Sequence, residues 1–320
     1  MPRLTVVIPN YNGEKYIEGC LNSLNKQTMT DYELIIVDNA SVDSSMDIIN
    51  NMCHKADILQ LDKNYGFAHA VNVGIEAACC EYVLLLNNDT EADEDFLENM
   101  LAAIERSPKI FSVSARMVQM YNHSLIDSAG DLYCGLGWSY SRGKDSPVCD
   151  YNKSSRIFSS CGGAAIYRRS LLLELGMFDV LHSSYLEDVD IGYRARINGY
   201  VNVYEPKAIV YHAGSGVTGS RHNDFKVRLS ARNSILLIYK NMPDLQIVMN
   251  LPLLIAGYII KCGFFIKKGL GGAYIKGVFD GLCMCDKACR VPFKKRNLLN
   301  YLVIQIELLI NIYKRFFGDV

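Results

Sequence analysis

The sequence lacks the glycine-rich loops by which many α/β proteins hold phosphate groups. No GxGxxG follows the first predicted strand, and GxxxxGK[ST] occurs nowhere in the 320 residues. Proteins that use these loops depend on backbone N–H groups that approach a phosphate closely. Their absence removes the main support for a dinucleotide-dependent oxidoreductase and for a P-loop nucleotide hydrolase.

The sequence also has little that indicates disulfides, zinc or secretion. The 11 cysteines are an odd number without framework spacing, and no CxxC pair with a nearby histidine indicates a zinc site. The first apolar run, Leu4–Ile8, passes directly into turn residues, so we expect no signal peptide. We therefore expect a reduced, cytosolic chain with free thiols.

The chain has no large excess of charge of either sign. A net charge of −1 argues against a general nucleic-acid-binding protein. However, 12 of the 33 Lys/Arg residues and 5 of the 34 Asp/Glu residues lie in residues 236–320, which gives this tail a net charge of +7 and the rest −8. A basic, apolar tail on an acidic body predicts contact with an anionic surface, most simply a membrane.

What the first third of the chain does contain is an alternation of short apolar runs with helical periodicity. This pattern predicts βαβ units and a doubly wound, mostly parallel sheet, because such units cross over with one hand. We expect strands at residues 4–9, 33–37, 58–61, 82–86 and 111–117, and helices at 14–27, 41–52, 68–78 and 94–105.

Polar residues follow three of these strands, at the edge where an open α/β sheet binds its ligands. They are Pro9–Asn12, Asp38-Asn39 and Asn87–Asp89. The carboxylate of Asp89, with amides beside it, can hold a hard divalent cation, and the cation can hold a diphosphate. The plainer alternative is that these residues only form turns at the strand ends.

The second half carries an acidic cluster, Glu187-Asp188-Val189-Asp190, at the start of a predicted helix. Helix capping and the helix dipole explain one or two of these acids but not all three. Upstream, residues 121–155 are expected to form a loop-rich flap near an acceptor. Gly162 and Gly163 either let the backbone approach a ligand or ease a bend in a strand.

Two further strands, at residues 201–204 and 208–211, are expected to end at His212, which is either a ligand or an ordinary strand-end residue. Beyond them the chain becomes helical and apolar, at residues 245–266 and 297–317. The first of these segments is about long enough to span a bilayer, but its internal Pro, Gly and Lys favour a re-entrant or in-plane helix. Two helices that simply pack together as a soluble subdomain are the alternative.

Taken together, the motifs resemble the family 2 glycosyltransferases, and more narrowly their rhamnosyltransferase-like branch. They occur in the family's order over roughly residues 3–240: Val6–Asn12, Ile36–Ser41, Asn64–Ala68 with Asn72 and Gly74, Leu86–Thr90, Glu187–Asp190, His212, and Arg232-Asn233. The resemblance implies a GT-A fold and an inverting transfer from a nucleoside-diphosphate sugar.

The resemblance also implies roles for individual residues. Asp188 is expected to be the catalytic base, and Asp89 and His212 are expected to hold Mg²⁺ or Mn²⁺. The expected donor contacts are Pro9, Tyr11, Asp38, Lys63, Asn64, Asn72 and Asn88, and the expected acceptor contacts are Gly162, Gly163 and Glu187. The chain departs from the family at Asn87, where the family's motif often has an Asp, and it lacks the Gln-x-x-Arg-Trp motif of processive synthases. The second departure favours addition of a single sugar.

These observations predict a catalytic domain at residues 1–235, with a nucleotide-sugar-binding half (1–120) and an acceptor-binding half (121–235). Residues 236–320 are expected to form a helical extension that associates with a membrane. The expected function is transfer of L-rhamnose from dTDP-rhamnose, or of a hexose from a UDP-sugar, to a glycan or lipid-linked acceptor in cell-surface polysaccharide synthesis. The expected location is the inner face of the cytoplasmic membrane. A nucleotidyltransferase and a non-catalytic sugar-nucleotide- or carbohydrate-binding protein are the alternatives.

Overall fold

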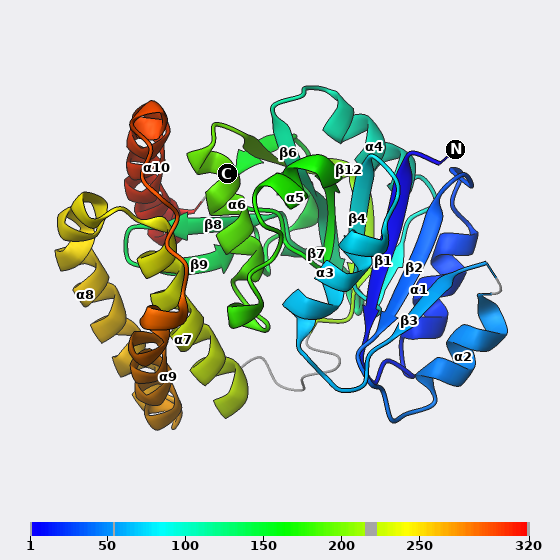
Figure 1. Ribbon diagram of the computed structural model, residues 1–320, viewed down its shortest axis with the longest axis horizontal. Coiled ribbons are helices and arrows are strands. Elements are labelled where there is room, and N and C mark those ends of the chain that lie inside the picture. The colour runs from blue at the N-terminus through cyan, green and yellow to red at the C-terminus, as the bar shows by residue number, and fades with distance from the viewer. Residues whose placement is uncertain (1, 54, 215–222, 319–320) are drawn as a thin grey trace.

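The computed structural model describes residues 2–53, 55–214 and 223–318. Within them ten strands form one mixed sheet, and β8 and β9 pair as a separate hairpin (Figure 1). The strands are β1 Leu4–Asn10, β2 Glu33–Asp38, β3 Asp57–Gln60, β4 Tyr82–Leu86, β5 Thr90–Ala92, β6 Ile110–Gln119, β7 Asn122–Ser128, β8 Asp131–Cys134, β9 Trp138–Ser141, β10 Ser155–Ile157, β11 Ala164–Arg168 and β12 Val201–His212.

Ten α-helices are present in the described part of the chain. They are α1 Ile17–Asn25, α2 Ser45–Met52, α3 Phe67–Ala77, α4 Phe96–Glu105, α5 Arg169–Glu174, α6 Glu187–Ile197, α7 Asp224–Asn241, α8 Asp244–Lys267, α9 Gly271–Met284 and α10 Leu298–Phe317. Four short 3-10 turns, η1 to η4, start at Val148, Val180, Cys285 and Lys295.

The strand order is β10-β12-β6-β11-β4-β1-β2-β3, and β1 to β4 are parallel to one another. The antiparallel strand β11 lies between β4 and β6, and β12 runs parallel to β6. The predicted, mostly parallel sheet is therefore confirmed. Because Asn10 of β1 is in register with Asp38 of β2, the polar strand ends meet at one edge.

Helices cover both faces of the sheet, so its strands are apolar on both sides. On one face, Val6 and Leu84 pack with α1, α2 and α4, and on the other Val7 and Leu85 pack with α3, α5 and α6. This double burial explains why Tyr82–Leu86 reads as an uninterrupted apolar run, and it fixes the position of the strand's polar end.

Two predictions about secondary structure are wrong, and one helix was not predicted. Residues 201–212 form one strand, not two, with a register shift between Glu205 and Ile209. Residues 121–155 are not a loop-rich flap, since they contain β7, β8 and β9 and much of their length is buried. The helix α9, which is rich in glycine, was not predicted.

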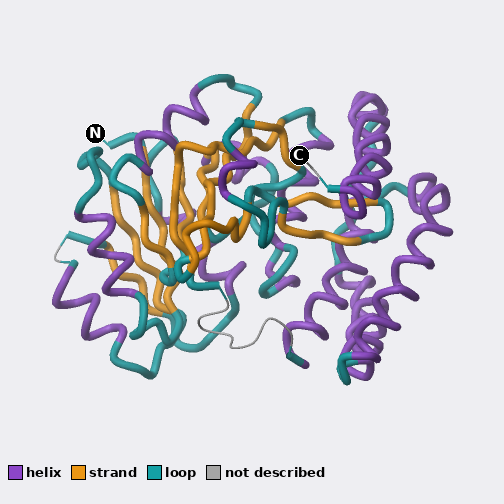
Figure 2. The backbone as a smooth tube through the Cα atoms, turned by 180° about the vertical axis from the view of Figure 1, so that it is seen from behind, coloured by secondary structure: helices purple, strands orange, loops and turns teal. Residues whose placement is uncertain are grey.

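The helices α7 to α10 stand at the end of the molecule opposite β3 (Figure 1). They are in contact with the body through α6 and through the β8–β9 hairpin, which Figure 2 shows reaching from the sheet to this helical layer. The helices α7 and α9 pack closely because Gly277 and Gly281 have no side chain: a Cβ at Gly277 would lie 2.2 Å from the carbonyl oxygen of Arg228. The predicted domain boundary at 235/236 falls inside α7.

Candidate active site

Asp188 lies in the first turn of α6, and the backbone around it holds its carboxylate. Its two oxygens accept hydrogen bonds from the N–H of Gly162 (3.2 Å) and the N–H of Val189 (2.8 Å). The neighbouring Gly163 accepts from the N–H of Asn87 (2.9 Å), at the end of β4. The glycine pair therefore links the predicted base to the strand end that carries Asp89. The predicted contact of these glycines with an acceptor stays a prediction.

The loop before Asp188 has an unusual backbone. Ser183, Tyr185 and Leu186 all have positive φ (61°, 69° and 68°), a conformation that side chains with a Cβ rarely adopt. The amide of Asn233 in α7 donates to the carbonyls of His182, Ser184 and Tyr185, at 2.7 to 2.9 Å, and Arg232 donates to those of Leu181 and His182. The Arg232-Asn233 pair thus holds this loop in place.

Asp188 has other acids close to it. One oxygen of Asp188, one oxygen of Asp131 and the sulfur of Cys161 lie within 4.8 Å of one another. Burial, and then the charge of Asp188, raise the pKa of Asp131 to about 8, and burial also raises the pKa of Asp188. Burial and the charge of Asp188 likewise raise the pKa of Glu187 well above its usual range, and its Oε2 has no hydrogen-bond partner among the described residues. Like charges this close cannot all ionise, so the cluster retains protons at neutral pH.

Asp190, two residues further along α6, has a different environment. Its carboxylate lies 2.7 Å from Arg194 and 2.9 Å from Lys240, and it accepts from the Asn241 amide at 2.7 Å. Burial opposes ionisation, but these cations outweigh it and hold the pKa of Asp190 well below its usual range. Asp179, His182 and Asp190 are close enough to share a metal ion, but Lys240 already pairs with both acids. We therefore read this group as a structural ion network.

The strand ends of β1, β2 and β4 share one hydrogen-bond network. The Asn10 amide donates to Asp38 (2.9 Å) and accepts from the Asn88 amide (2.8 Å). Asp38 also accepts from the N–H (3.1 Å) and the hydroxyl (2.6 Å) of Ser41. A carboxylate has about four acceptor positions, so these three bonds leave Asp38 about one for a nucleotide base. The structure brings Asp38 and Asn88 together as predicted, and their contact with a donor stays a prediction.

The other predicted donor residues have more varied positions. Pro9 is half-buried at the end of β1, and Tyr11 is exposed beside it. Lys63 is exposed with its ammonium 4.8 Å from the Tyr65 ring centroid, and Asn64 accepts from the Asn39 amide at 3.0 Å in the loop before α3.

Asn72 lies deeper, on α3. Its amide donates to the carbonyl of Phe178 (2.7 Å) and accepts from its N–H (3.0 Å). This pair of bonds gives Asn72 a structural role between α3 and the segment after α5.

Asp89 and His212 meet as the sequence predicts. The His212 Nε2 atom lies 3.3 Å from a carboxylate oxygen of Asp89, because β12 runs beside β5. On the other side of the ring, Nδ1 lies 2.8 Å from Asp127, and Asp127 in turn pairs with Lys144. Burial opposes a charge on His212, but hydrogen bonds to Asp127 and Asp89 outweigh it and raise its pKa to about 9.

This arrangement fits a divalent cation. The Asp89 carboxylate lies beside the Nε2 atom of His212, and the Asp127 carboxylate holds Nδ1, as is usual for metal-binding histidines. Mg²⁺ and Mn²⁺ are often bound by one or two protein ligands together with substrate phosphates. Asp89 and His212 would hold the ion, and the ion would supply positive charge for a departing diphosphate.

A family model described as "Glycosyl transferase family 2" matches residues 5–176. The matched region begins at β1 and includes the strand ends that carry Asp38 and Asp89. It also includes Gly162 and Gly163, next to the predicted base.

The chain belongs to glycosyl transferase family 2.

Two curated relatives match part of this chain. A teichoic acid poly(glycerol phosphate) polymerase of Staphylococcus epidermidis is 37% identical over 95 residues, which are 28% of this chain and 13% of the relative. A poly-beta-1,6-N-acetyl-D-glucosamine synthase of Staphylococcus aureus is 23% identical over 211 residues, which are 65% of this chain and 49% of that enzyme. This chain thus spans half or less of the length of both. The rhamnosyltransferase-like branch stays a prediction.

Solved structures share the fold at low identity. S. aureus TarS 1-349 in complex with UDP-GlcNAc has a TM-score of 0.60 at 20% identity and covers 97% of this chain and 89% of that one. GalNAc-T7 with UDP, GalNAc and Mn²⁺ has a TM-score of 0.60 at 16% identity, covering 74% of this chain and 48% of that one. A mannosyltransferase from Pyrobaculum calidifontis with GDP-Man and Mn²⁺ has a TM-score of 0.57 at 17% identity, covering 100% and 88%. The GT-A fold is therefore established.

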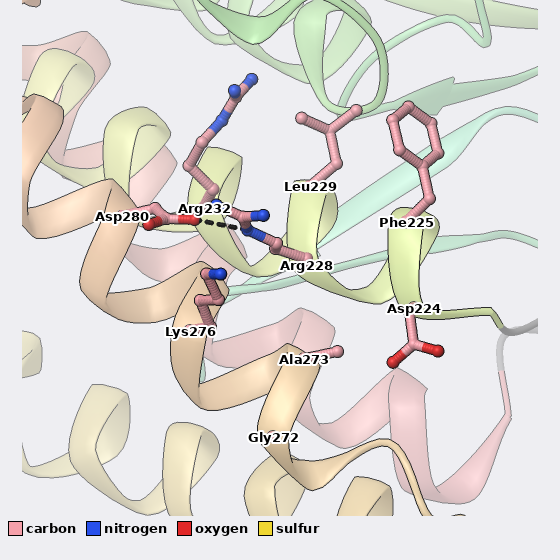
Figure 3. A pocket seen from close by; sticks show the side chains of 9 residues that line it. All are labelled: Asp224, Phe225, Arg228, Leu229, Arg232, Gly272, Ala273, Lys276 and Asp280. Atoms are coloured by element: carbon pink, nitrogen blue, oxygen red, sulfur yellow. Dashed lines mark hydrogen bonds and ion pairs between the residues drawn. The ribbon is translucent and has the colours of Figure 1, made fainter.

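A separate cleft of 590 Å³ lies between α7 and α9 (Figure 3). Asp280 and Arg228 form an ion pair at 2.6 Å across it, and Lys276 stands beside them. Arg232 of the family motifs lines this cleft, but none of the predicted catalytic, donor, acceptor or metal residues does. We place the chemistry at the strand ends, where the acids and the histidine converge, and not in this cleft.

Two residues of the site were missed by sequence reasoning. Asp127 and Asp131 belong to the stretch that was predicted to be a loop-rich flap, so their positions on strands could not be anticipated. The sequence signal that could have found them is the short run Asp127-Ser128-Ala129-Gly130-Asp131, whose glycine at φ 87° turns the chain from β7 into β8.

Proposed function

We propose that this protein is an inverting glycosyltransferase that moves one sugar from a nucleoside-diphosphate sugar to a hydroxyl group of a glycan or lipid-linked acceptor. The observation that carries the proposal is the placement of Asp188. It is a half-buried carboxylate without an ion pair to any described Lys or Arg, held by two N–H groups and joined through Gly162 and Gly163 to the strand end that bears Asp89. An acid with a purely structural role would be paired with cations, as Asp190 is with Arg194 and Lys240.

In the proposed reaction, Asp188 takes the proton of the acceptor hydroxyl as the acceptor oxygen attacks the anomeric carbon. The new C–O bond forms on one face of the sugar while the bond to the diphosphate breaks on the other. The electron pair of the broken bond leaves with the nucleoside diphosphate. A single displacement of this kind inverts the anomeric carbon, and a general base contributes about 10²–10⁴-fold.

For the donor we propose a UDP-sugar, with UDP-GlcNAc as the first to test and dTDP-rhamnose as the second. The TarS structure is a complex with UDP-GlcNAc, and the S. aureus synthase is named for an N-acetylglucosamine polymer. For the product we propose a cell-surface polysaccharide or its lipid-linked precursor, since the relatives are named for teichoic acid and poly-N-acetylglucosamine. We also propose that the enzyme acts at the inner face of the cytoplasmic membrane and that it uses Mg²⁺ or Mn²⁺.

The test pairs two isosteric variants of neighbouring acids on α6. Asp188→Asn should lower transfer by at least about 100-fold while donor binding, measured by calorimetry, persists. Asp190→Asn should instead lower the melting temperature, because Arg194 and Lys240 lose their buried partner, a loss of about 3–5 kcal/mol. Full activity of Asp188→Asn would support the non-catalytic binding protein instead. Failure of every uridine or thymidine diphosphate sugar to bind would refute the proposal.

A further inference from the structure

The helix α8 places the amides of Gln246 and Asn250 against the protein and many of its apolar side chains toward the outside. Asn250 and Gln246 are buried, and both amides donate to the side-chain oxygen of Gln305 in α10, at 2.8 and 3.0 Å. On the opposite side, Val248 is 65% exposed and Ile259 is 66% exposed. This is the reverse of a helix that packs on a protein in water, where the apolar side faces inward.

The helix α10 also exposes apolar side chains, although its buried side holds Tyr301, Ile304 and Leu308 together with one amide, that of Asn311. Asn311 is buried and donates to the carbonyl of Tyr133 (2.9 Å), and Glu307 pairs with Arg196 of α6. Leu299 and Val303 are 74% and 58% exposed. The two helices stand on the same end of the molecule (Figures 1 and 2), and each leaves several apolar side chains exposed there. Contiguous apolar surfaces of this kind mark interaction sites.

We call this surface the apolar face and define it by six exposed side chains: Val248, Ile255, Ile259, Leu299, Val303 and Ile306. We infer that the apolar face docks on a lipid bilayer rich in anionic headgroups, with α8 and α10 lying in the plane of the membrane. The inference adds a docking surface to the proposed function and does not depend on the transfer reaction.

Basic residues at the ends of these helices favour a bilayer over a second copy of the chain as the partner of the apolar face. Lys267 and Lys268 follow the apolar part of α8, and Lys294, Lys295 and Arg296 lead into α10. Anionic headgroups complement this charge at a membrane surface. In a symmetric dimer built on the same face, the like charges of the two copies would oppose one another.

Contacts with the β8–β9 hairpin show why the helices lie on the membrane and do not cross it. By length and composition, α8 is the one described helix that could cross a bilayer. However, the Trp138 indole donates to the carbonyl of Gly257 in the middle of α8 (3.1 Å), and Tyr140 donates to that of Asn311 in α10 (2.8 Å). A Cβ at Gly257 would lie 2.2 Å from the carbonyl of Leu136. A spanning α8 would therefore carry the hairpin into the hydrocarbon, where its polar backbone is unfavourable.

The experiment is flotation of the full-length protein with vesicles, without donor or acceptor, so that its failure cannot be confused with failure of the proposed reaction. The protein should float with vesicles of phosphatidylcholine and phosphatidylglycerol in equal parts, and much less with phosphatidylcholine alone. The Leu299→Glu/Val303→Glu double variant should lower the partition coefficient about 100-fold, because two side chains lose their apolar surroundings. Ile255→Glu/Ile259→Glu on α8 should have the same effect.

The control is Leu173→Glu, which changes an exposed apolar residue of α5 on another part of the surface and should float like the wild type. An alkaline carbonate wash should release the bound protein. Three results would overturn the inference: no flotation of the wild type, equal flotation with both kinds of vesicle, or retention after carbonate, which would indicate a span. A stable dimer in lipid-free solution that the Leu299→Glu/Val303→Glu variant dissociates would assign the face to a second copy instead.

Discussion

At the scale of single residues, hydrogen bonding separates the acids that carry charge from those that keep a proton. Asp188 accepts two backbone N–H groups, which favour its ionised form, whereas the more deeply buried Asp131 accepts from the hydroxyl of Ser141, a bond that does not offset its burial. Burial and the charge of Asp188 raise the pKa of Asp131 to about 8. We infer that Asp131 is the proton-holding partner that allows Asp188 to be the base.

This inference predicts how the stability of Asp131→Asn depends on pH. An acid whose pKa is raised by folding stabilises the folded state below its unfolded pKa of about 4 and loses that effect as the pH rises through 8. The melting temperature of the variant should therefore match the wild type near pH 4 and exceed it increasingly up to pH 8. An upward shift of about 2–4 °C per kcal/mol is expected by calorimetry.

The matched control for this prediction is Asp150→Asn, which replaces an exposed acid. Its melting temperature should follow the wild type at every pH. A constant difference between Asp131→Asn and the wild type over the same pH range would show that Asp131 is not the proton-holding group.

A second residue-scale prediction concerns Asp127, which holds the Nδ1 side of His212 at 2.8 Å. If His212 binds a metal through Nε2, loss of this carboxylate should weaken binding about 10–100-fold. Mn²⁺ titration of Asp127→Asn, followed by electron paramagnetic resonance with UDP present, measures the effect. Asp145→Asn, an exposed acid nearby, should bind Mn²⁺ like the wild type. Unchanged Mn²⁺ affinity in Asp127→Asn would remove His212 from the proposed metal site.

At the scale of elements, α7 shapes the loop that presents the base. Asn233 is fully buried, and its amide lies within hydrogen-bond distance of three carbonyls of residues 182–185, where the backbone has positive φ. This loop also meets the predicted donor loop, since Ser183 accepts from the N–H of Ala68 (2.9 Å). The start of α6 and the start of α3 are thus held together.

We predict that Asn233→Ala loses more activity than its lower stability, and hence its smaller folded fraction, would explain. The unpaired carbonyls should cost about 1–3 kcal/mol of unfolding free energy, and kcat should fall at least about tenfold at temperatures where the variant is fully folded. Ser230→Ala, one turn away on α7, should behave like the wild type. Normal kcat together with a lower melting temperature would give Asn233 a purely structural role.

At the scale of the whole molecule, the C-terminal helices complete the core of the catalytic body. Val189 and Tyr193 of α6 pack in one buried cluster with Leu254 of α8 and Ile304 of α10. The helix that carries the base is therefore covered by the same helices that expose the apolar face.

Removal of residues 242–320 is accordingly expected to do more than release the protein from membranes. It should expose the α6 cluster, so the truncated chain should be degraded readily in limited proteolysis and should not transfer sugar even to a soluble acceptor. Full-length protein with the Leu299→Glu/Val303→Glu change is the control, because it alters the surface alone. A truncated chain with normal melting and transfer would show that the extension is an independent attachment.

Much of the fold and site could be predicted because their signals are local. Apolar runs of strand length and helical periodicity predicted β1 to β4 and their helices. The polar residues after these strands predicted Asp38 and Asp89 as site residues. The resemblance to the family gave Asp188 and His212, and the structure brings His212 to Asp89 through the pairing of β12 with β5. Asp127 and Asp131 could not be predicted, because short, polar strands such as β7 resemble loops in sequence.

The sequence by itself determined the parallel sheet and the polar edge of its strands, since both follow from periodicity along the chain, and its motifs carry the family. Only the tertiary structure decided which acid is neutralised and which is not. Asp188 and Asp190 differ because Arg194 and Lys240 reach one of them, and Lys240 comes from α7, fifty residues later. The tertiary structure also decided that the amides of α8 and Asn311 of α10 face inward, because Gln305 of α10 and the β8–β9 hairpin offer them hydrogen-bond partners.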